Sequence, residues 1–280
     1  HQDKIQHTLS EYFYRDQHQA LAQDPQTNIF DRYRLIALTH KNTALIYNTL
    51  PTSRSLALTN NEIHQLTLFH SGLSLPYSVP GHCLLCSSHY DPRYTSHAMS
   101  CSATRRNNVT ARHEYVVKAI HLLALEAHAH VKHEPRLGLG HTNRHPDLLL
   151  MFHTGESRFI DVTIRHGPTP NRLTQHIDEQ KLLASACQAK QAKYRGDIHC
   201  FDNTVDFKTG AASTFGTFSA DLENIIEQLK IMYHTTSPED TSYPFRVKAN
   251  IAFAIQRGNA KILRDFAIYH KRLIDSPQHL

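Results

Sequence analysis

The chain has 280 residues, of which 40% are hydrophobic and 20% are charged, and its formal net charge is +5 at pH 7. It is long enough to bury one or two hydrophobic cores without disulfide support, which excludes the small disulfide-stabilised scaffolds. It also has no apolar run approaching the roughly 18 to 20 residues that a bilayer helix requires, so we expect no membrane partner.

Two segments of the chain concentrate positive charge. Residues 81–120 hold five lysines and arginines against two acidic residues, and residues 163–195 hold six against two. Clusters of this kind suit a polyanionic partner such as a nucleic acid. The chain begins at His1 and shows no signal-peptide pattern, so we expect it to be part of a longer polypeptide.

Residues 1–80 are predicted to form a helical segment that ends in a connector. Thr59 and Glu62 fit a capping box, in which the threonine side chain accepts the backbone N–H of the glutamate and the glutamate side chain reaches back. Residues 71–81 contain glycine and proline and cannot continue that helix, so they are predicted to connect it to the rest of the chain.

The next region predicts three strands after a helix. Hydrophobic residues recur at three- and four-residue steps over 110–129, which indicates a helix with one buried face. Residues 131–136 are predicted to form a short strand. Residues 147–152 and 158–164 are apolar runs on either side of a loop that contains Gly155, which is the pattern of a β-hairpin.

The last part of the chain predicts a helix, a strand and a final helix. Residues 173–194 are rich in Ala, Leu, Gln and Lys, and a short strand follows near 204–207. Asn259 is predicted to cap the last helix. The order helix, strand, strand, strand, helix, strand predicts an α/β (α+β) fold, preceded by a helical segment and a zinc knuckle.

The zinc knuckle is predicted from four closely spaced potential ligands, in the pattern Cys83-x2-Cys86-x10-His97-x3-Cys101. Three thiolates and one imidazole form a closed tetrahedral set that Zn²⁺ accepts as a structural ion. His82 and His89 compete for the fourth position, and in a chain with 23 histidines a chance grouping is the alternative. Four protein ligands leave no open position for water, so we expect a structural brace or a nucleic-acid contact.

Two aspartates lie in the strands of the predicted hairpin. Asp147 stands at the start of its first strand and Asp161 lies within its second, so antiparallel pairing would bring both carboxylates to one end of the sheet. Their hard oxygen atoms favour Mg²⁺ or Mn²⁺ as a catalytic ion for phosphodiester cleavage. Glu114 is a further candidate ligand and Glu134 a weaker one. A capping role for Asp147 and a solvated edge position for Asp161 are the alternatives.

Phosphodiester cleavage also needs a cation to offset the charge that develops on the phosphate. The position two residues after Asp161 holds Thr163 rather than lysine. Lys190, Lys193 and Tyr194 share one face of the following predicted helix, which would supply the ammonium if it packed over the end of the sheet. A solvated basic helix face is the alternative.

The motifs CLLC…SHAMSC, ARHEYVVKAI, HEP, RHPD, FIDVTI, KQAKY, TFGTF and AIQRGNA follow one another along the chain. Together they resemble the C-terminal region of reverse transcriptases from site-specific non-LTR retrotransposons, over about residues 56–270. In that family a Cys-Cys-His-Cys zinc module precedes a restriction-like endonuclease of the PD-(D/E)xK superfold, so the resemblance implies a core made of a mixed sheet flanked by helices. The resemblance implies a helical linker segment (1–80), a zinc module (81–103), an endonuclease core (104–234) and a C-terminal helical extension (235–280).

The resemblance also implies roles for individual residues. Asp147 and Asp161 would be the ligands of the catalytic metal, Lys190 or Lys193 the active-site lysine, and Tyr194 its neighbour. The zinc ligands implied are Cys83, Cys86, His97 and Cys101. The nucleic-acid contacts predicted from the family's Arg-His element and from the basic segments are Arg105, Arg106, Arg112, His113 and Arg165.

The function implied is that of a metal-dependent endonuclease, which nicks one strand of a DNA target so that the new 3′ end primes reverse transcription. The partners would be target DNA, element RNA and the upstream reverse transcriptase domains of the same polypeptide, in the nucleus after cytoplasmic synthesis. Two alternatives stay open. One is a catalytically inactive or host-recruited nucleic-acid-binding module on the same fold, and the other is a structural RNA-associated protein that uses its zinc module for assembly.

Overall fold

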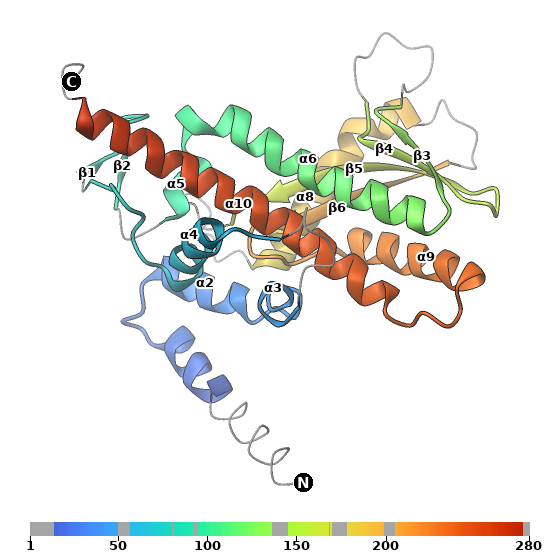
Figure 1. Ribbon diagram of the computed structural model, residues 1–280, viewed down its shortest axis with the longest axis horizontal. Coiled ribbons are helices and arrows are strands. Elements are labelled where there is room, and N and C mark those ends of the chain that lie inside the picture. The colour runs from blue at the N-terminus through green and yellow to red at the C-terminus, as the bar shows by residue number, and fades with distance from the viewer. Residues whose placement is uncertain are drawn as a thin grey trace.

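A four-stranded mixed sheet lies among helices in the computed structural model (Figure 1). The structure describes residues 14–49, 57–79, 81–91, 95–135, 145–167, 169, 178–198 and 205–276. The sheet contains β3 (His130–His133), β4 (Leu148–Met151), β5 (Ser157–Arg165) and β6 (Val205–Ser213). The fold is therefore mixed α and β, of the α+β class, as the sequence predicts.

The sheet has the order β3-β4-β5-β6. Strands β3, β4 and β5 pair in antiparallel fashion, which confirms the predicted hairpin, and β6 pairs with β5 in parallel. A parallel pair needs a crossover connection, and α8 (Glu179–Ile198) supplies it between β5 and β6. The strand predicted near 204–207 is longer than expected, because it pairs with β5 along its whole length.

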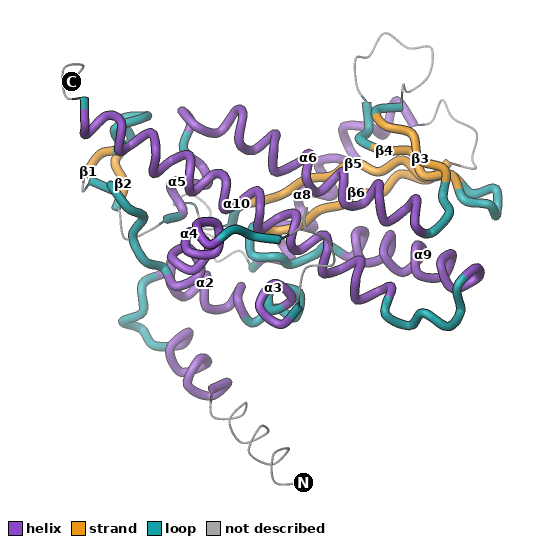
Figure 2. Tube along the Cα trace, viewed as in Figure 1, coloured by secondary structure: helices purple, strands orange, loops and turns teal. Residues whose placement is uncertain are grey.

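Among the remaining described elements, a helix over 14–23 comes first. It is followed by α2 (Ile29–Leu38), α3 (Leu45–Asn48), α4 (Asn60–Ser71), β1 (Gly81–His82), β2 (His89–Tyr90), α5 (Ser96–Ser100), α6 (Ser102–Glu126), α9 (Ala220–Thr236) and α10 (Tyr243–Asp275). Of these, α6, α9 and α10 lie beside the sheet, whereas β1, β2 and α5 lie near the C-terminal end of α10 (Figures 1 and 2). Helix α6 corresponds to the helix predicted over 110–129 but begins directly after Cys101. The N-terminal half of the helix predicted over 173–194 lies partly outside the described residues.

The two faces of the sheet are covered by different helices. Ile160 and Val162 of β5 belong to a hydrophobic cluster with residues of α6, α9 and α10. Phe159, the neighbour of Ile160, instead packs with Tyr194 of α8 and Phe207 of β6. Alternate residues of β5 therefore point to opposite layers, as strand geometry requires. Both faces of β5 are therefore buried in the middle of the strand, from Phe159 to Thr163.

Helix α10, which occupies most of the predicted C-terminal helical extension over 235–280, packs into the core. Its residues Val247, Ile251 and Ile255 join the same hydrophobic cluster as Ile160 of the sheet. The predicted cap at Asn259 is wrong, because Asn259 lies inside this 33-residue helix with 0% exposure. A polar residue followed by hydrophobic residues at helical spacing is compatible with the start of a helix. It is equally compatible with a buried polar residue inside a helix.

Helices α6 and α10 pack closely at one glycine. A Cβ atom built on Gly258 would lie 2.3 Å from Cγ of Arg112 and 2.8 Å from its Cα. Glycine is therefore needed at this position for the helices to approach. Arg112 is 2% exposed, and its Nη1 donates to Oδ1 of Asn259 at 3.0 Å.

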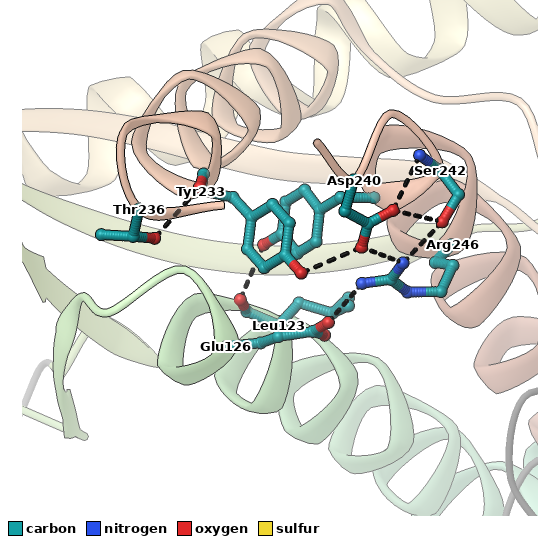
Figure 3. A network of polar contacts seen from close by, with 8 residues as sticks. Leu123, Glu126, Tyr233, Thr236, Asp240, Ser242 and Arg246 are labelled. Carbon is teal, nitrogen blue, oxygen red and sulfur yellow. Dashed lines mark hydrogen bonds and ion pairs between the residues drawn. The ribbon is translucent and has the colours of Figure 1, made fainter. Parts of the chain in front are cut away.

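A polar network fixes the connection between α9 and α10 (Figure 3). The carboxylate of Asp240 accepts from the hydroxyl of Tyr233 at 2.9 Å and from Nη1 of Arg246 at 2.7 Å. Arg246 also pairs with Glu126 at the end of α6. The rings of Tyr233 and Tyr243 stack with centroids 4.0 Å apart. The network therefore links the start of α10 to the C-terminal end of α6.

The helical segment before the zinc module has the caps that its sequence predicts. Thr59 and Glu62 form the complete capping box at the start of α4. Gly72 ends α4 with a φ of 69°, a left-handed conformation that glycine adopts at little cost. The ring of Phe69 in α4 stacks on the ring of Phe215 in the turn after β6. This contact packs the helical segment against that turn. Within the described residues, no helix combines the length and the apolarity needed to cross a membrane.

Candidate active site and metal centre

Asp161 lies within β5, and its side chain faces α8. It is 3% exposed, so its carboxylate requires partners inside the protein. The hydroxyl of Tyr194 lies 2.8 Å from Oδ1, and Nζ of Lys190 lies 2.5 Å from Oδ2. Within the described residues Oδ2 has this ion pair but no hydrogen bond of good geometry. The positive charge of Lys190 therefore compensates the burial of this oxygen.

Asp147 immediately precedes β4, next to the position of Asp161. Leu148 pairs with Ile160 in the antiparallel ladder between β4 and β5. Asp147, which precedes Leu148, is therefore opposite Asp161, which follows Ile160. Oδ2 of Asp147 accepts the backbone N–H of Val162 at 2.5 Å. The structure thus brings the two predicted aspartates to the same end of β4, with different side-chain partners.

His113 of α6 holds the Asp147 carboxylate from another direction. Its Nε2 lies 3.0 Å from Oδ2 of Asp147, and its Nδ1 lies 3.5 Å from Oε1 of Glu114. Burial by itself would lower the pKa of His113, but hydrogen bonding to Asp147 and the charges of both acids raise it above its usual value. The Glu114 side chain is 64% exposed, and its described contact is with His113. Glu134 is exposed, and its backbone N–H donates to the carbonyl of Asp147.

The basic face predicted on α8 points toward Asp161. Tyr194 is 0% exposed, and its hydroxyl also lies 3.0 Å from the backbone carbonyl of His145. Lys193 approaches the same hydroxyl at 3.1 Å. Only Lys190 is in direct ion-pair contact with the Asp161 carboxylate among the lysines of the described part of α8. The geometry therefore distinguishes two lysines that spacing alone leaves equivalent.

The predicted nucleic-acid contacts differ in position. Arg112 is buried and bonded to Asn259, so the prediction that it contacts nucleic acid is corrected: its guanidinium joins α6 to α10. Burial lowers the pKa of Arg112 to about 10. Arg165 is half-buried at the end of β5. Arg105 and Arg106 lie in the first turns of α6, and their side chains are outside the described part of the structure.

The four residues predicted to bind zinc come together in space. One ligand atom from each of them lies within 4.8 Å of all the others: Cys83, Cys86, His97 and Cys101. They come from the β1–β2 turn, from α5 and from the residue before α6. His82 and His89, the competing candidates, meet edge to face on β1 and β2 and are exposed. The cluster that the structure gives is therefore Cys₃His.

The distances in this cluster fit a tetrahedral zinc site. Usual zinc bond lengths imply about 3.8 Å between two sulfur ligands and about 3.6 Å between a sulfur and a nitrogen ligand. The Sγ atoms of Cys83 and Cys101 are 3.9 Å apart, and Sγ of Cys86 is 3.5 Å from Nε2 of His97. The three thiols form no disulfide with one another. The cluster can bind a metal such as zinc.

The electrostatics of the cluster also call for a cation. Burial raises the pKa of Cys83 to about 12, and it raises the pKa of Cys101 as well. A buried thiolate without a positive partner is therefore disfavoured, whereas a bound divalent cation removes this cost by coordinating the sulfur directly. Burial also acts to raise the pKa of Cys86, but hydrogen bonds with Ser88, Cys83 and Cys101 together lower it below its usual value.

Comparison with known proteins gives no relative: no protein-family model matches the chain, and no curated protein matches it.

Two groups of buried polar residues have contacts that the sequence did not predict. Gln256 and Asn259 of α10 both donate to the carbonyl of Thr214 in the turn after β6. Glu179, at the start of α8, accepts from the hydroxyls of Ser213 and Tyr33, at 2.8 and 3.3 Å. Thr214 belongs to the motif TFGTF, and Gln256 and Asn259 belong to the motif AIQRGNA. The sequence shows both motifs, but only the folded chain shows that they are in contact.

Proposed function

We propose that this chain is a metal-dependent DNA endonuclease module that nicks a target strand by attack of water on a phosphodiester. The observation that carries the proposal is the buried carboxylate of Asp161, held by Lys190 and Tyr194, with Asp147 at the neighbouring backbone position across the β4–β5 ladder. Paired acids with an adjacent ammonium match the needs of phosphodiester cleavage.

The element order supports a restriction-endonuclease-like core for this module. Helix α6, strands β3 to β5, helix α8 and strand β6 follow one another as they do in the sequence-based expectation. The mixed sheet, with β6 parallel to β5, carries both aspartates on adjacent strands. Because a fold alone does not establish an activity, the proposal depends on the side chains at this end of the sheet.

The proposed roles follow from the contacts of each residue. Asp147 and Asp161 would hold a divalent cation, which when bound polarises the phosphate and lowers the pKa of the attacking water. His113 orients the Asp147 carboxylate, and Tyr194 fixes the Asp161 carboxylate through Oδ1. Both partners are anchored on helices, so the carboxylates are held before substrate arrives.

Lys190 is the proposed catalytic cation among the side chains. Its ammonium neutralises Asp161 in the structure, and its side chain is 25% exposed, so it can also face solvent and an approaching phosphate. A positive group at this place offsets the charge that develops on the phosphate during hydrolysis. Lys193 lies one helical turn further and contacts the Tyr194 hydroxyl instead.

The wider biological role is proposed from the motif resemblance. The nick would expose a 3′ end that primes reverse transcription by upstream domains of the same polypeptide, with element RNA as template. This places the activity in the nucleus, on a DNA target. The Cys₃His cluster would bind structural Zn²⁺ and brace the region where the chain enters α6.

The test is nicking of supercoiled plasmid DNA by the full chain with Mg²⁺ or Mn²⁺. Asp161→Asn keeps the shape of the side chain and an acceptor for Tyr194 but removes the charge. We expect it to lose on the order of 100-fold or more in nicking rate while retaining DNA binding in a gel-shift assay. Asp206→Asn is the matched control, because Asp206 is a 49% exposed carboxylate on the same sheet that pairs with Lys208.

The outcomes separate the two leading functions. If the protein is an endonuclease, the wild type and the Asp206→Asn variant nick DNA and the Asp161→Asn variant does not. A non-catalytic nucleic-acid-binding module binds DNA in all three forms and nicks in none of them. Equal nicking by wild type and the Asp161 variant would reject the proposed site.

A further inference from the structure

His270, near the C-terminal end of α10, reaches the metal cluster although it is not one of its four ligands. It is 0% exposed, and its Nε2 lies 3.4 Å from Sγ of Cys83. The four ligand atoms of the cluster are mutually within 4.8 Å, and His270 is outside that set. Its contact is therefore with one sulfur atom of the centre.

Aromatic rings hold His270 in this position. The ring of Phe266, one turn earlier on α10, lies 4.3 Å from the His270 ring between centroids. Tyr90 of β2 meets the edge of His270 at 6.4 Å and stacks on the ligand His97 at 4.6 Å. The imidazole of His270 is thus enclosed by Phe266 of its own helix and by Tyr90 of the zinc module. It has little freedom to turn away from Cys83.

A thiolate in a metal centre can only accept hydrogen bonds. Three thiolates and one neutral imidazole around a divalent cation leave one net negative charge, and both Cys83 and Cys101 are 1% exposed. Water cannot reach Cys83 to stabilise that charge, so its hydrogen-bond donors come from the protein. The backbone N–H groups of Leu85 and Cys86 are two such donors, and a side-chain donor adds to them. The ring nitrogen that faces Cys83 belongs to His270.

We propose that His270 is a positioning residue for the metal centre. Its Nε2–H donates to the thiolate of Cys83, stabilises the metal-bound form and couples occupancy of the zinc module to the docking of the last turns of α10. Partners of this kind, beyond the ligands themselves, commonly change metal affinity by about 10-fold to 100-fold when removed. The proposal rests on metal binding by the Cys₃His cluster and is independent of the endonuclease activity.

The test compares two variants of nearly equal shape in the full chain. Glutamine can present an N–H close to the place of Nε2, whereas methionine has the same length without a donor. Zn²⁺ affinity is measured by competition with a chelator, and Co²⁺ is used as a spectroscopic probe of the thiolates. We expect His270→Met to lower Zn²⁺ affinity by about 10-fold and to shift the thiolate-to-cobalt charge-transfer band. His270→Gln should keep the affinity within about threefold and leave the band in place.

A measurement on the wild-type protein keeps the proposal open to refutation if the methionine variant does not fold. In the cadmium-113 form, the His270 Nε2–H proton should show scalar coupling to the metal through Cys83. Absence of a proton on Nε2, or equal affinities and spectra for the two variants, would overturn the role of His270. Failure of the wild type to bind Zn²⁺ or Co²⁺ would overturn the metal centre with it, and would leave the nicking assay as a separate question.

Discussion

The ammonium of Lys190 lies 2.5 Å from Oδ2 of Asp161, and this ion pair joins the middle of α8 to β5. Tyr194 contacts the other oxygen of the same carboxylate from the next turn of the helix. The crossover helix that makes β6 parallel to β5 therefore also completes the candidate site. The same packing allows the two lysines of α8 to be told apart by experiment.

Lys190→Ala should lower the nicking rate by about 100-fold to 1,000-fold, whereas Lys193→Ala should reduce it by less than about 10-fold. The first change removes the cation beside Asp161, and removal of one such electrostatic group typically costs about 100-fold to 1,000-fold in rate. The second removes a contact to the Tyr194 hydroxyl, which keeps the carbonyl of His145 and Asp161 as partners. Rates on supercoiled plasmid at fixed Mg²⁺ check both. A larger loss in the Lys193 variant would reverse the assignment of the active-site lysine.

Gly258→Ala should destabilise the fold by about 1–3 kcal/mol, because the added methyl group overlaps Arg112 and drives α6 and α10 apart. Gly210→Ala is the control. At Gly210 in β6 the nearest atom to an added Cβ is 3.5 Å away, which is ordinary contact. Urea unfolding of the three proteins gives the free energies. Equal stability of the two variants would contradict the close helix approach at Gly258.

Stability should depend on pH through Glu179. Burial raises the pKa of this carboxyl, although hydrogen bonds from Thr217, Ser213 and Tyr33 oppose the shift. Between the usual value and the raised value, the folded protein holds a proton that the unfolded chain has released. The contribution of Glu179 to stability therefore falls as pH rises through that window.

Glu179→Gln removes this titration and keeps an acceptor for the surrounding hydroxyls. We expect the unfolding free energy of the variant, relative to that of wild type, to increase as pH is raised from about 4.5, near the usual glutamate pKa, toward neutrality. Urea unfolding at a series of pH values measures the difference. A constant difference, or one that shrinks with rising pH, would show that Glu179 is not the group responsible.

Removal of zinc should loosen more than the β1–β2 turn. Cys83 and Cys101 belong to a hydrophobic cluster with Phe69 of α4 and with Ile262 and Phe266 of α10. A metal present at about 1,000 times its dissociation constant contributes about 4 kcal/mol of stability. Calorimetry with and without a chelator should show a lower Tm that Zn²⁺ restores and Mg²⁺ does not. An unchanged Tm after complete removal of zinc would separate the module from the core.

Local spacing was enough to predict much of the architecture. The capping box at Thr59, the hairpin around Gly155 and the Cys₃His spacing each depend on residues close together in the chain, and the structure has all three. The shared face of Lys190 and Tyr194 follows from helix periodicity alone. The neighbouring backbone positions of Asp147 and Asp161 were predictable for the same reason, since a short loop fixes the register of a hairpin.

Packing between distant segments decided the rest. Arg112 has the charge of a phosphate contact, but burial under α10 gives it Asn259 as a partner instead. Whether His270 belongs to the metal centre depends on where α10 ends relative to β1, and no spacing rule relates positions so far apart. Periodicity fixes the neighbours of a residue within its own helix or hairpin. The neighbours supplied by another element are fixed only when whole surfaces fit together, and that fit exists only in the folded chain.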